Sequence, residues 1–305
     1  NQSRDGNAVD SGDATPIETA AFDVLNTNSW EATDLVLVPA SLSAAGDKVE
    51  DERGRPVRSQ RLTTGELAIL AERVPGFGSH RYSIRPGEPP TSGRARASGT
   101  KLDNGSVFIV LDPADGSIRS MKWTKAGNID LVDPSAARGL NAYLYVPGLD
   151  PAGAEGVSNV RVSVKERGPL VASLLVESDA PGTRGLAREV RIVHGLDRID
   201  LADRIDKAAV RDKESVHIAF PFRVPGGQVR LDLGWGMIRP DADQIAGACK
   251  DFFPVHSAAD VSNDDFGVTW VSADAPLAEI GRMTDETPRA KGRRAWRTEV
   301  GPSQT

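Results

Sequence analysis

One stretch of the chain brings together the residue types that bind sugars. It contains, in order, Trp235, Arg239, Asp243, Gln244 and His256. The face of a tryptophan can stack on the apolar side of a pyranose ring, while guanidinium, carboxylate, amide and imidazole groups hydrogen-bond to its hydroxyls. These residue types therefore indicate a carbohydrate-binding loop.

The same stretch also has a structural interpretation, which stays open at this point. Trp235 and Trp270 would then be core aromatics, and Arg239 would form an ion pair with Asp241. Cys249, the single cysteine, is expected to be a small buried residue. A Cys249–His256 nucleophile is the alternative.

The sequence indicates neither a catalytic pair nor a metal site. Glycosidases need two carboxylates, about 5 Å apart in retaining enzymes and about 6.5–9.5 Å apart in inverting ones, and among 43 acidic residues no pair stands out. The four histidines, His80, His194, His217 and His256, are far apart in sequence, whereas metal sites need convergent ligands. His217 lies on the polar face of a predicted strand, where we weigh a cross-strand hydrogen bond against a sugar or metal contact. We assign no catalytic residue, no metal ligand and no cofactor to this chain.

The amino-acid composition is that of an ordinary, mildly acidic globular protein. The formal charge is −6, and 39% of residues are hydrophobic. A nucleic-acid partner would require a clustered basic excess, and the short run at 289–297 is interleaved with Ala, Gly and Trp. No run of about 20 apolar residues predicts a membrane span, and no signal peptide is visible. Because the chain does not begin with Met, we expect it to be part of a longer protein, and its compartment is not indicated.

The elements that must position these residues are strands. No segment keeps a helical period for more than two turns. In the first part of the chain, short alternations between turn residues predict strands at 22–26, 34–39, 61–66, 66–73 and 81–85. We expect a disordered leader over residues 1–16, a small β-sandwich over 17–86 and a linker rich in Pro and Gly at 87–99.

Residues 100–305 predict a second, larger all-β domain. Its clearest signals are three antiparallel hairpins, which pair 106–111 with 117–123, 159–165 with 169–177, and 189–194 with 198–205. Such regular spacing of strands is typical of a large β-sandwich.

The candidate sugar-binding residues belong to the stretch 213–277 of this domain. Strands are predicted there at 215–223, 228–233 and 266–271, around an aperiodic excursion at 234–265. Loops of this length inside a compact domain are uncommon and tend to be functional. We therefore expect a ligand or a partner at this excursion.

A series of motifs runs through nearly the whole chain. They are NTNSWE at 26–31, GSIRS at 116–120, RGPL at 167–170, RID at 198–200, VHIAFPF at 216–222, IRPDADQ at 238–244, DVSN at 260–263 and GVTWVSADAPL at 267–277. In this order they resemble the carboxy-terminal β region of glycoside hydrolase family 38, the retaining α-mannosidases.

The resemblance implies a small β-sandwich followed by a large antiparallel supersandwich of the galactose-mutarotase type, with further strands beyond Thr305, so that the large sandwich would be incomplete here. It also implies that the nucleophilic aspartate and the zinc ligands belong to an upstream catalytic domain of the same protein. No His-x-Asp sequence, the family's first zinc motif, occurs in this chain. The implied partners are that domain and a mannose-containing glycan.

Three functions remain open at this point. The first is a non-catalytic β region of an α-mannosidase-like glycoside hydrolase, which supports the catalytic domain, contributes to carbohydrate binding and is inactive alone. The second is a freestanding carbohydrate-binding module. The third is a mutarotase-like or lyase-like enzyme that uses the large sandwich itself, which would need a convergent His and Glu in a concave sheet.

Overall fold

The computed structural model describes residues 20–90, 92–240, 242–245, 248, 250–281 and 283. Over these residues the protein is all-β, as the sequence predicts, and its helical segments are three short 3₁₀ turns, η1 (Ala40–Leu42), η2 (Thr124–Ala126) and η3 (Pro151–Gly153). The chain divides into two compact units between Gly93 and Arg94. The predicted leader, the basic run, Asp241 and Cys249 lie outside the described residues. In the described part, no helix has the length and hydrophobicity that a membrane crossing needs.

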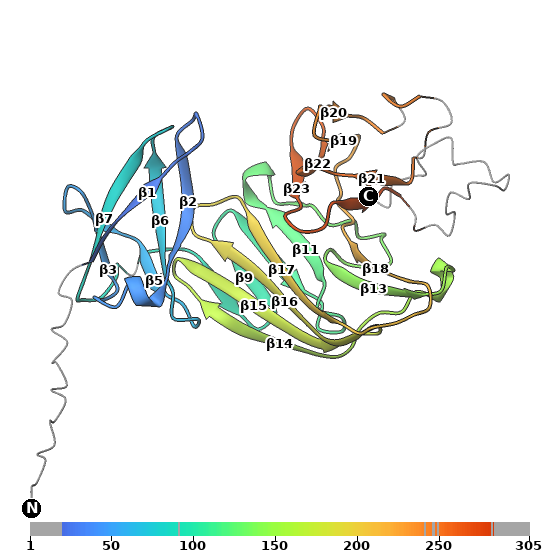
Figure 1. Ribbon diagram of the computed structural model, residues 1–305, viewed down its shortest axis with the longest axis horizontal. Helices are drawn as coiled ribbons and strands as arrows, with labels where there is room; N and C mark the ends of the chain where they lie inside the picture. The colour runs from blue at the N-terminus through green and yellow to red at the C-terminus, as the bar shows by residue number, and fades with distance from the viewer. Residues whose placement is uncertain are drawn as a thin grey trace, which may run out of the picture. The chain divides into compact units, whose positions relative to one another are not determined.

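The first unit is a small β-sandwich, drawn in blue to cyan in Figure 1. Its strands are β1 (Ala20–Leu25), β2 (Ala32–Val38), β3 (Lys48–Asp51), β4 (Pro56–Val57), β5 (Ser59–Arg61), β6 (Leu67–Val74) and β7 (Ser79–Arg85). One sheet has the order β1-β7-β3-β4 and the other β2-β6-β5. Alternate side chains such as Leu67, Ile69 and Ile84 meet in one buried core, as the strand period of two requires.

The predicted strand at 61–66 is wrong. After β5 ends at Arg61 the chain turns, because the Leu62 N–H donates to the Glu66 carbonyl (2.9 Å) and the Gly65 N–H donates to the Leu62 carbonyl (2.9 Å). Gly65 has a φ of 89°, in the left-handed region that glycine occupies without strain. The glycine therefore ends one strand before β6 begins.

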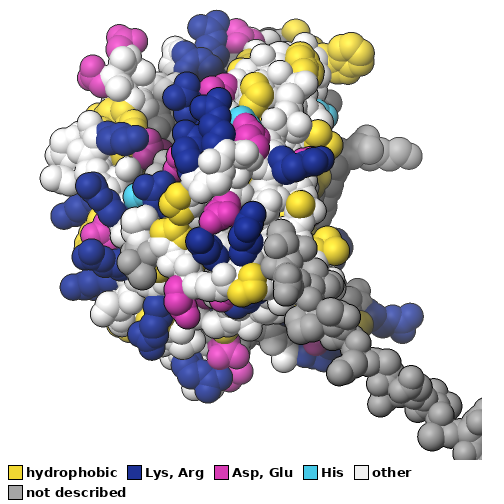
Figure 2. All heavy atoms as spheres, turned by 90° about the vertical axis from the view of Figure 1, so that its left-hand side faces the viewer, with side chains coloured by type: hydrophobic (Ala, Val, Ile, Leu, Met, Phe, Trp, Pro, Cys, Tyr) yellow, Lys and Arg dark blue, Asp and Glu magenta, His cyan; other side chains and the backbone are white. Residues whose placement is uncertain are grey.

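Charged side chains of opposite sign lie side by side on this unit. Arg81 pairs with Asp23 (2.8 Å), and Arg58 pairs with Glu72 (2.7 Å). Figure 2 accordingly shows Lys and Arg side chains interspersed with Asp and Glu. Exposed pairs stabilise a fold by at most about 1 kcal/mol each, so their main effect here is to balance charge on the surface.

The second unit carries the remaining strands. Its longer strands are β10 (Val107–Leu111), β11 (Ile118–Trp123), β13 (Ala142–Pro147), β14 (Ser158–Arg167), β15 (Val171–Asp179), β16 (Thr183–Val193), β17 (Ile199–Lys207), β18 (Glu214–Ala219), β19 (Gln228–Asp232), β22 (Ala258–Ser262) and β23 (Gly267–Val271). Its shorter strands are β8 (Arg96–Ser98), β9 (Lys101–Asp103), β12 (Ile129–Asp130), β20 (Met237–Ile238), β21 (Phe252–Pro254) and β24 (Leu277–Glu279). The sheet orders are β12-β11-β10-β9-β8, β14-β15-β16-β17, β20-β19-β22-β23, β13-β18 and β21-β24.

The main core of this unit lies between the five-stranded sheet and the β14–β17 sheet, which lie one over the other in Figure 1. Leu102, Ile109 and Ile118 of the first sheet belong to the same buried cluster as Leu174 and Ile192 of the second. Two antiparallel sheets that share an apolar core form a β-sandwich.

The three predicted hairpins of this unit are confirmed. β10 pairs with β11, β14 with β15, and β16 with β17, each antiparallel. The register of β14, β15, β16 and β17 places Arg161 opposite Glu177, Glu177 opposite Ala187, and Ala187 opposite Arg204. Because side chains alternate between faces, these four lie in one row on the outer face of the sheet, away from the core.

Two predictions for the stretch 213–277 are right only in part. The strand predicted at 215–223 ends at Ala219, because Pro221 has no N–H to continue a ladder. The excursion at 234–265 contains β20, β21 and β22, and β22 lies between β19 and β23. These strands are two to five residues long, too short for an alternation to stand out.

Candidate functional site

Trp235 stands at the tip of the tight turn that joins β19 to β20. The Leu233 N–H donates to the Gly236 carbonyl (3.2 Å), and Gly234, the first central residue, has a φ of 89°. Glycine with positive φ at this position is the signature of a type II′ hairpin turn. The Trp235 side chain is fully exposed, so both ring faces are open to a ligand and the core interpretation is wrong for this residue.

Trp270 behaves differently. It is half-buried, and its ring lies 5.3 Å from that of Phe220. This separation is typical of packed aromatic pairs. Trp270 is therefore a structural residue, and the two tryptophans of this stretch have separate roles.

Asp232 holds the base of the Trp235 turn together. Its carboxylate accepts hydrogen bonds from the Gly234 N–H (2.8 Å) and from the Ser257 hydroxyl, and it lies 3.5 Å from Nδ1 of His256. The Ser257 hydroxyl, the Gly234 amide and the His256 ring together lower the pKa of Asp232. The His256 side chain remains 70% exposed beside the turn, where its other ring nitrogen can meet a ligand.

The order of these three groups does not suit nucleophilic catalysis. In a hydrolase triad the imidazole lies between the hydroxyl and the carboxylate, so that it can take the hydroxyl proton. Here the Asp232 carboxylate contacts both Ser257 and His256. The cluster therefore fixes the shape of the turn.

Arg239 and Asp243 form the second polar pair of this stretch. The Asp243 carboxylate accepts from Nη2 of Arg239 (2.8 Å), from its Nε (3.2 Å) and from its backbone N–H (2.7 Å). These hydrogen bonds lower the pKa of Asp243 to about 2. Both side chains are exposed, so the pair presents a fixed guanidinium to solvent. The expected partner Asp241 lies outside the described residues.

The predicted site residues thus fall into two adjacent groups. Trp235 and His256 meet at one turn, while Arg239 and Asp243 pair beyond β20. Gln244 is half-buried and follows that pair directly. Met237 and Ile245 are exposed like Trp235, which adds apolar surface that a ligand or a partner would cover.

The other described histidines make contacts within the protein. Nε2 of His217 lies 2.9 Å from the Ser215 hydroxyl, and its Nδ1 lies 3.5 Å from the Glu279 carboxylate. Burial lowers the pKa of His217. Both ring nitrogens therefore face protein groups, which leaves this His and Glu pair poorly placed for acid–base work on a ligand. His194 accepts the Arg94 N–H (3.2 Å), and no group of three His, Cys, Asp or Glu among the described residues could hold a metal.

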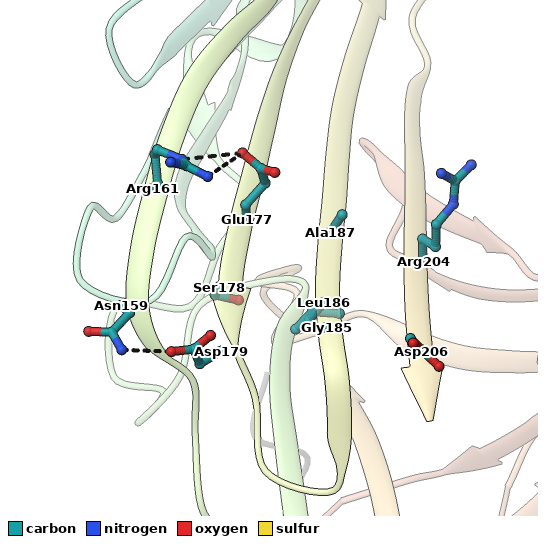
Figure 3. A pocket seen from close by; sticks show the side chains of 10 residues that line it. All are labelled: Asn159, Arg161, Glu177, Ser178, Asp179, Gly185, Leu186, Ala187, Arg204 and Asp206. Atoms are coloured by element: carbon teal, nitrogen blue, oxygen red, sulfur yellow. Dashed lines mark hydrogen bonds and ion pairs between the residues drawn. The ribbon is translucent and has the colours of Figure 1, made fainter. Parts of the chain in front are cut away.

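A second polar site lies on the outer face of the β14–β17 sheet, and none of its residues was expected from the sequence. It is an open hollow of about 370 Å³. Figure 3 shows Arg161 and Glu177 turned toward each other on one side, Ala187 in the middle and Arg204 on the other side. The alternation of side chains along each strand predicts which of these residues point to the outer face. Their proximity depends on how the four strands pair, which the pattern of a single strand does not show.

Comparisons with known proteins identify the fold. No family model matches the chain, and no curated protein matches it. Among solved structures, the two-unit β fold is similar to part of an α-mannosidase from Enterococcus faecalis V583. The TM-score is 0.61 with 13% sequence identity, over 84% of this chain and 37% of that chain. This chain therefore shares its fold with somewhat over a third of an α-mannosidase.

Proposed function

We propose that this chain is the non-catalytic β region of a larger α-mannosidase-like glycoside hydrolase. The observation that carries the proposal is the shared fold, which takes in 84% of this chain and 37% of the α-mannosidase chain. The motifs at 26–31, 216–222 and 267–277 support the carboxy-terminal region of family 38 in particular. In this proposal the larger unit is a galactose-mutarotase-type sandwich, and an upstream domain of the same protein supplies the nucleophile and zinc.

The Trp235 turn supplies the carbohydrate contact in this proposal. A mannose ring of the substrate glycan stacks on the exposed indole, and its hydroxyls hydrogen-bond to His256 and Arg239. Asp232 and Asp243 hold these two side chains in place, which reduces the entropy lost on binding. The turn thus lengthens the substrate cleft beyond the catalytic domain.

Activity of the isolated chain tests the first part. The purified chain, incubated with an aryl α-mannoside and zinc, is expected to give no turnover. Turnover with a kcat typical of enzymes, about 1–10³ s⁻¹, would overturn the proposal that catalysis belongs to another domain.

Replacement of Trp235 by Ala in the complete enzyme tests the second part. Losing a stacking contact worth about 0.5–1.5 kcal/mol should raise KM about 2- to 10-fold with kcat nearly unchanged, the pattern expected when uniform binding is lost. Trp30→Ala is a matched control, because Trp30 is an exposed tryptophan of the first unit. If Arg239→Ala and Asp243→Ala alter neither Michaelis parameter nor thermal stability, the turn has no role in substrate binding.

The full exposure of Trp235 favours a second candidate, a freestanding carbohydrate-binding module. Calorimetry separates it from the first. A module binds mannan or mannose oligosaccharides saturably without any other domain, and Trp235→Ala abolishes that binding while Trp30→Ala does not. A β region that works only beside its catalytic domain gives no measurable heat at the Trp235 turn.

A further inference from the structure

The hollow on the outer face of the β14–β17 sheet arises from side-chain size. Gly185 and Ala187 of β16 lie between longer side chains on the neighbouring strands, with Glu177 on β15 and Arg204 and Asp206 on β17 (Figure 3). Neighbouring strands are about 4.8 Å apart. The small side chains of β16 therefore form a shallow strip, and the polar side chains of β15 and β17 border it on either side. We call this strip the β16 trough.

Each carboxylate at the trough already has a partner. Glu177 accepts from Nη2 of Arg161 (3.0 Å), and Asp206 accepts from Nη2 of Arg184 (2.6 Å). Asp179 accepts from the side-chain amide of Asn159 (2.6 Å). A carboxylate has about four lone-pair sites, so these oxygens can still accept hydrogen bonds from a ligand while their positions are fixed.

The charges at the trough select against charged ligands. Its lining carries two guanidinium groups, Arg161 and Arg204, and three carboxylates, Glu177, Asp179 and Asp206. Arg184, which pairs with Asp206, brings the guanidinium groups to three, so the charges balance and the trough has no net positive charge to attract a phosphate or other anion. A metal ion would find the carboxylates engaged by Arg and Asn. Arg204 is exposed at the border of the trough, so its N–H groups are accessible to a neutral acceptor.

We propose that the β16 trough binds a neutral saccharide. A sugar ring lies on the strip formed by Gly185 and Ala187, its hydroxyls donate to Glu177 and Asp206, and its oxygens accept from Arg204. Adjacent donors and acceptors at fixed positions suit vicinal hydroxyls, each of which both donates and accepts. This site is on a different sheet from the Trp235 turn and goes beyond the proposed function, since it requires neither a catalytic domain nor that turn.

The trough can be filled without disturbing the sheet. A Cβ built on Gly185 meets no atom within 4 Å, and the φ of Gly185 is not in the left-handed region. Valine also favours strands, so Gly185→Val should fold normally and occupy the floor. Gly153→Val is the matched control, because Gly153 is equally open and belongs to η3.

The test is a titration of the purified chain with methyl α-mannoside, α-mannobiose, cellobiose and xylobiose, followed by calorimetry or NMR. At least one sugar is expected to saturate with a Kd in the millimolar range, since no aromatic residue lines the trough. Gly185→Val should weaken that binding at least 10-fold, and Arg204→Ala several-fold, while Gly153→Val and Trp235→Ala leave it unchanged.

Three outcomes overturn the proposal. They are the absence of saturation by every sugar, binding that neither Gly185→Val nor Arg204→Ala weakens, and saturation of the trough by inorganic phosphate. Arg204→Ala keeps the test valid if Gly185→Val fails to fold, as judged by thermal unfolding. Binding that is lost only in Trp235→Ala would assign the sugar to the turn. Turnover assays have no part in this test, so its failure is distinct from failure of the proposed function.

Discussion

The β14–β17 sheet and the β20-β19-β22-β23 sheet belong to the same unit but are built in opposite ways. The strands of the first are 9 to 11 residues long, and apolar residues of their inner face, such as Leu174, Val176 and Ile192, belong to the main core. The strands of the second are 2 to 5 residues long, and beside them Trp235, Met237 and Val271 are exposed. Exposed apolar side chains add little to folding, so the second sheet offers more apolar surface to a ligand or partner than the long sheet does.

The outer face of the long sheet is also ordered, by charge. Glu189 pairs with Lys165 (2.5 Å) and Arg191 (3.2 Å). Burial alone would raise the pKa of Glu189, but the hydrogen bond from Lys165, together with the charges of Lys165 and Arg191, lowers it. Both faces of the long sheet are thus held by side-chain contacts, whereas the Trp235 turn is held by a few polar groups at its base.

The first prediction concerns the core of the long sheet and carries the largest effect. Leu174 is fully buried in β15, so Leu174→Ala should lower the free energy of unfolding by about 2–5 kcal/mol through lost burial and the cavity left behind. Leu277→Ala, at an exposed leucine of β24, should change it by less than about 0.5 kcal/mol. Urea denaturation measures both. A cost below about 1 kcal/mol for Leu174→Ala contradicts the assignment of this core.

The second prediction compares a glycine from each region. Both Gly116, beside the long sheet, and Gly234, in the turn, have positive φ. A Cβ on Gly116 would lie 2.3 Å from Cγ1 of Val176 and 2.8 Å from Nη2 of Arg188, whereas a Cβ on Gly234 would have its nearest contact at 3.5 Å, with His256.

Gly234→Ala should therefore cost only the backbone strain, about 1–2 kcal/mol. Gly116→Ala adds overpacking of about 1–3 kcal/mol and should cost about 2–5 kcal/mol in total. Thermal or urea unfolding of the two variants gives the difference. If both variants lose the same free energy of unfolding, the backbone at residues 112–117 can shift to relieve the overpacking, and the close contacts of Gly116 do not limit stability.

The sequence predicts the long sheet better than the short one, for a physical reason. In antiparallel hairpins the alternation of Val160, Val162 and Val164 with polar residues marks both the strand and its buried face. The start of β16 was missed, since the predicted strand begins at 189 and β16 begins at Thr183. Arg188 faces inward there, 1% exposed, and donates to the backbone carbonyls of Asn141 and Asp115. A buried arginine breaks the apolar pattern, and its acceptors lie far away in sequence.

The sequence picks out the candidate site residues by type but does not give their arrangement. Composition singled out Trp235, Arg239 and His256 as a sugar-binding set, yet the exposure of Trp235 depends on the turn that Gly234 permits. The pairing of Arg239 with Asp243 depends on local backbone geometry, since the Arg239 N–H also donates to this carboxylate. The β16 trough was not predictable, because it requires the register of three strand pairs, which no local pattern contains.

The third prediction concerns stability at the turn itself. Because the Trp235 side chain is fully exposed, Trp235→Ala should change the free energy of unfolding by less than about 0.5 kcal/mol. Phe253→Ala, at a buried aromatic of the neighbouring β21, should cost about 3–5 kcal/mol. Urea denaturation compares them. A cost above about 1 kcal/mol for Trp235→Ala would mean that the indole packs on the protein, and would remove the argument that it serves a ligand.

The Arg239–Asp243 pair should give the smallest effect, visible as a pH dependence. Since hydrogen bonds from Arg239 lower the pKa of Asp243 from 3.8 to about 2, its contribution to stability is complete above pH 3.8 and is lost as pH falls from 3.8 toward 2. The stability difference between Asp243→Asn and the unmodified chain should therefore shrink over that window. NMR titration in Arg239→Ala should return the Asp243 midpoint toward 3.8, and a midpoint that stays near 2 would show that Arg239 does not hold this carboxylate.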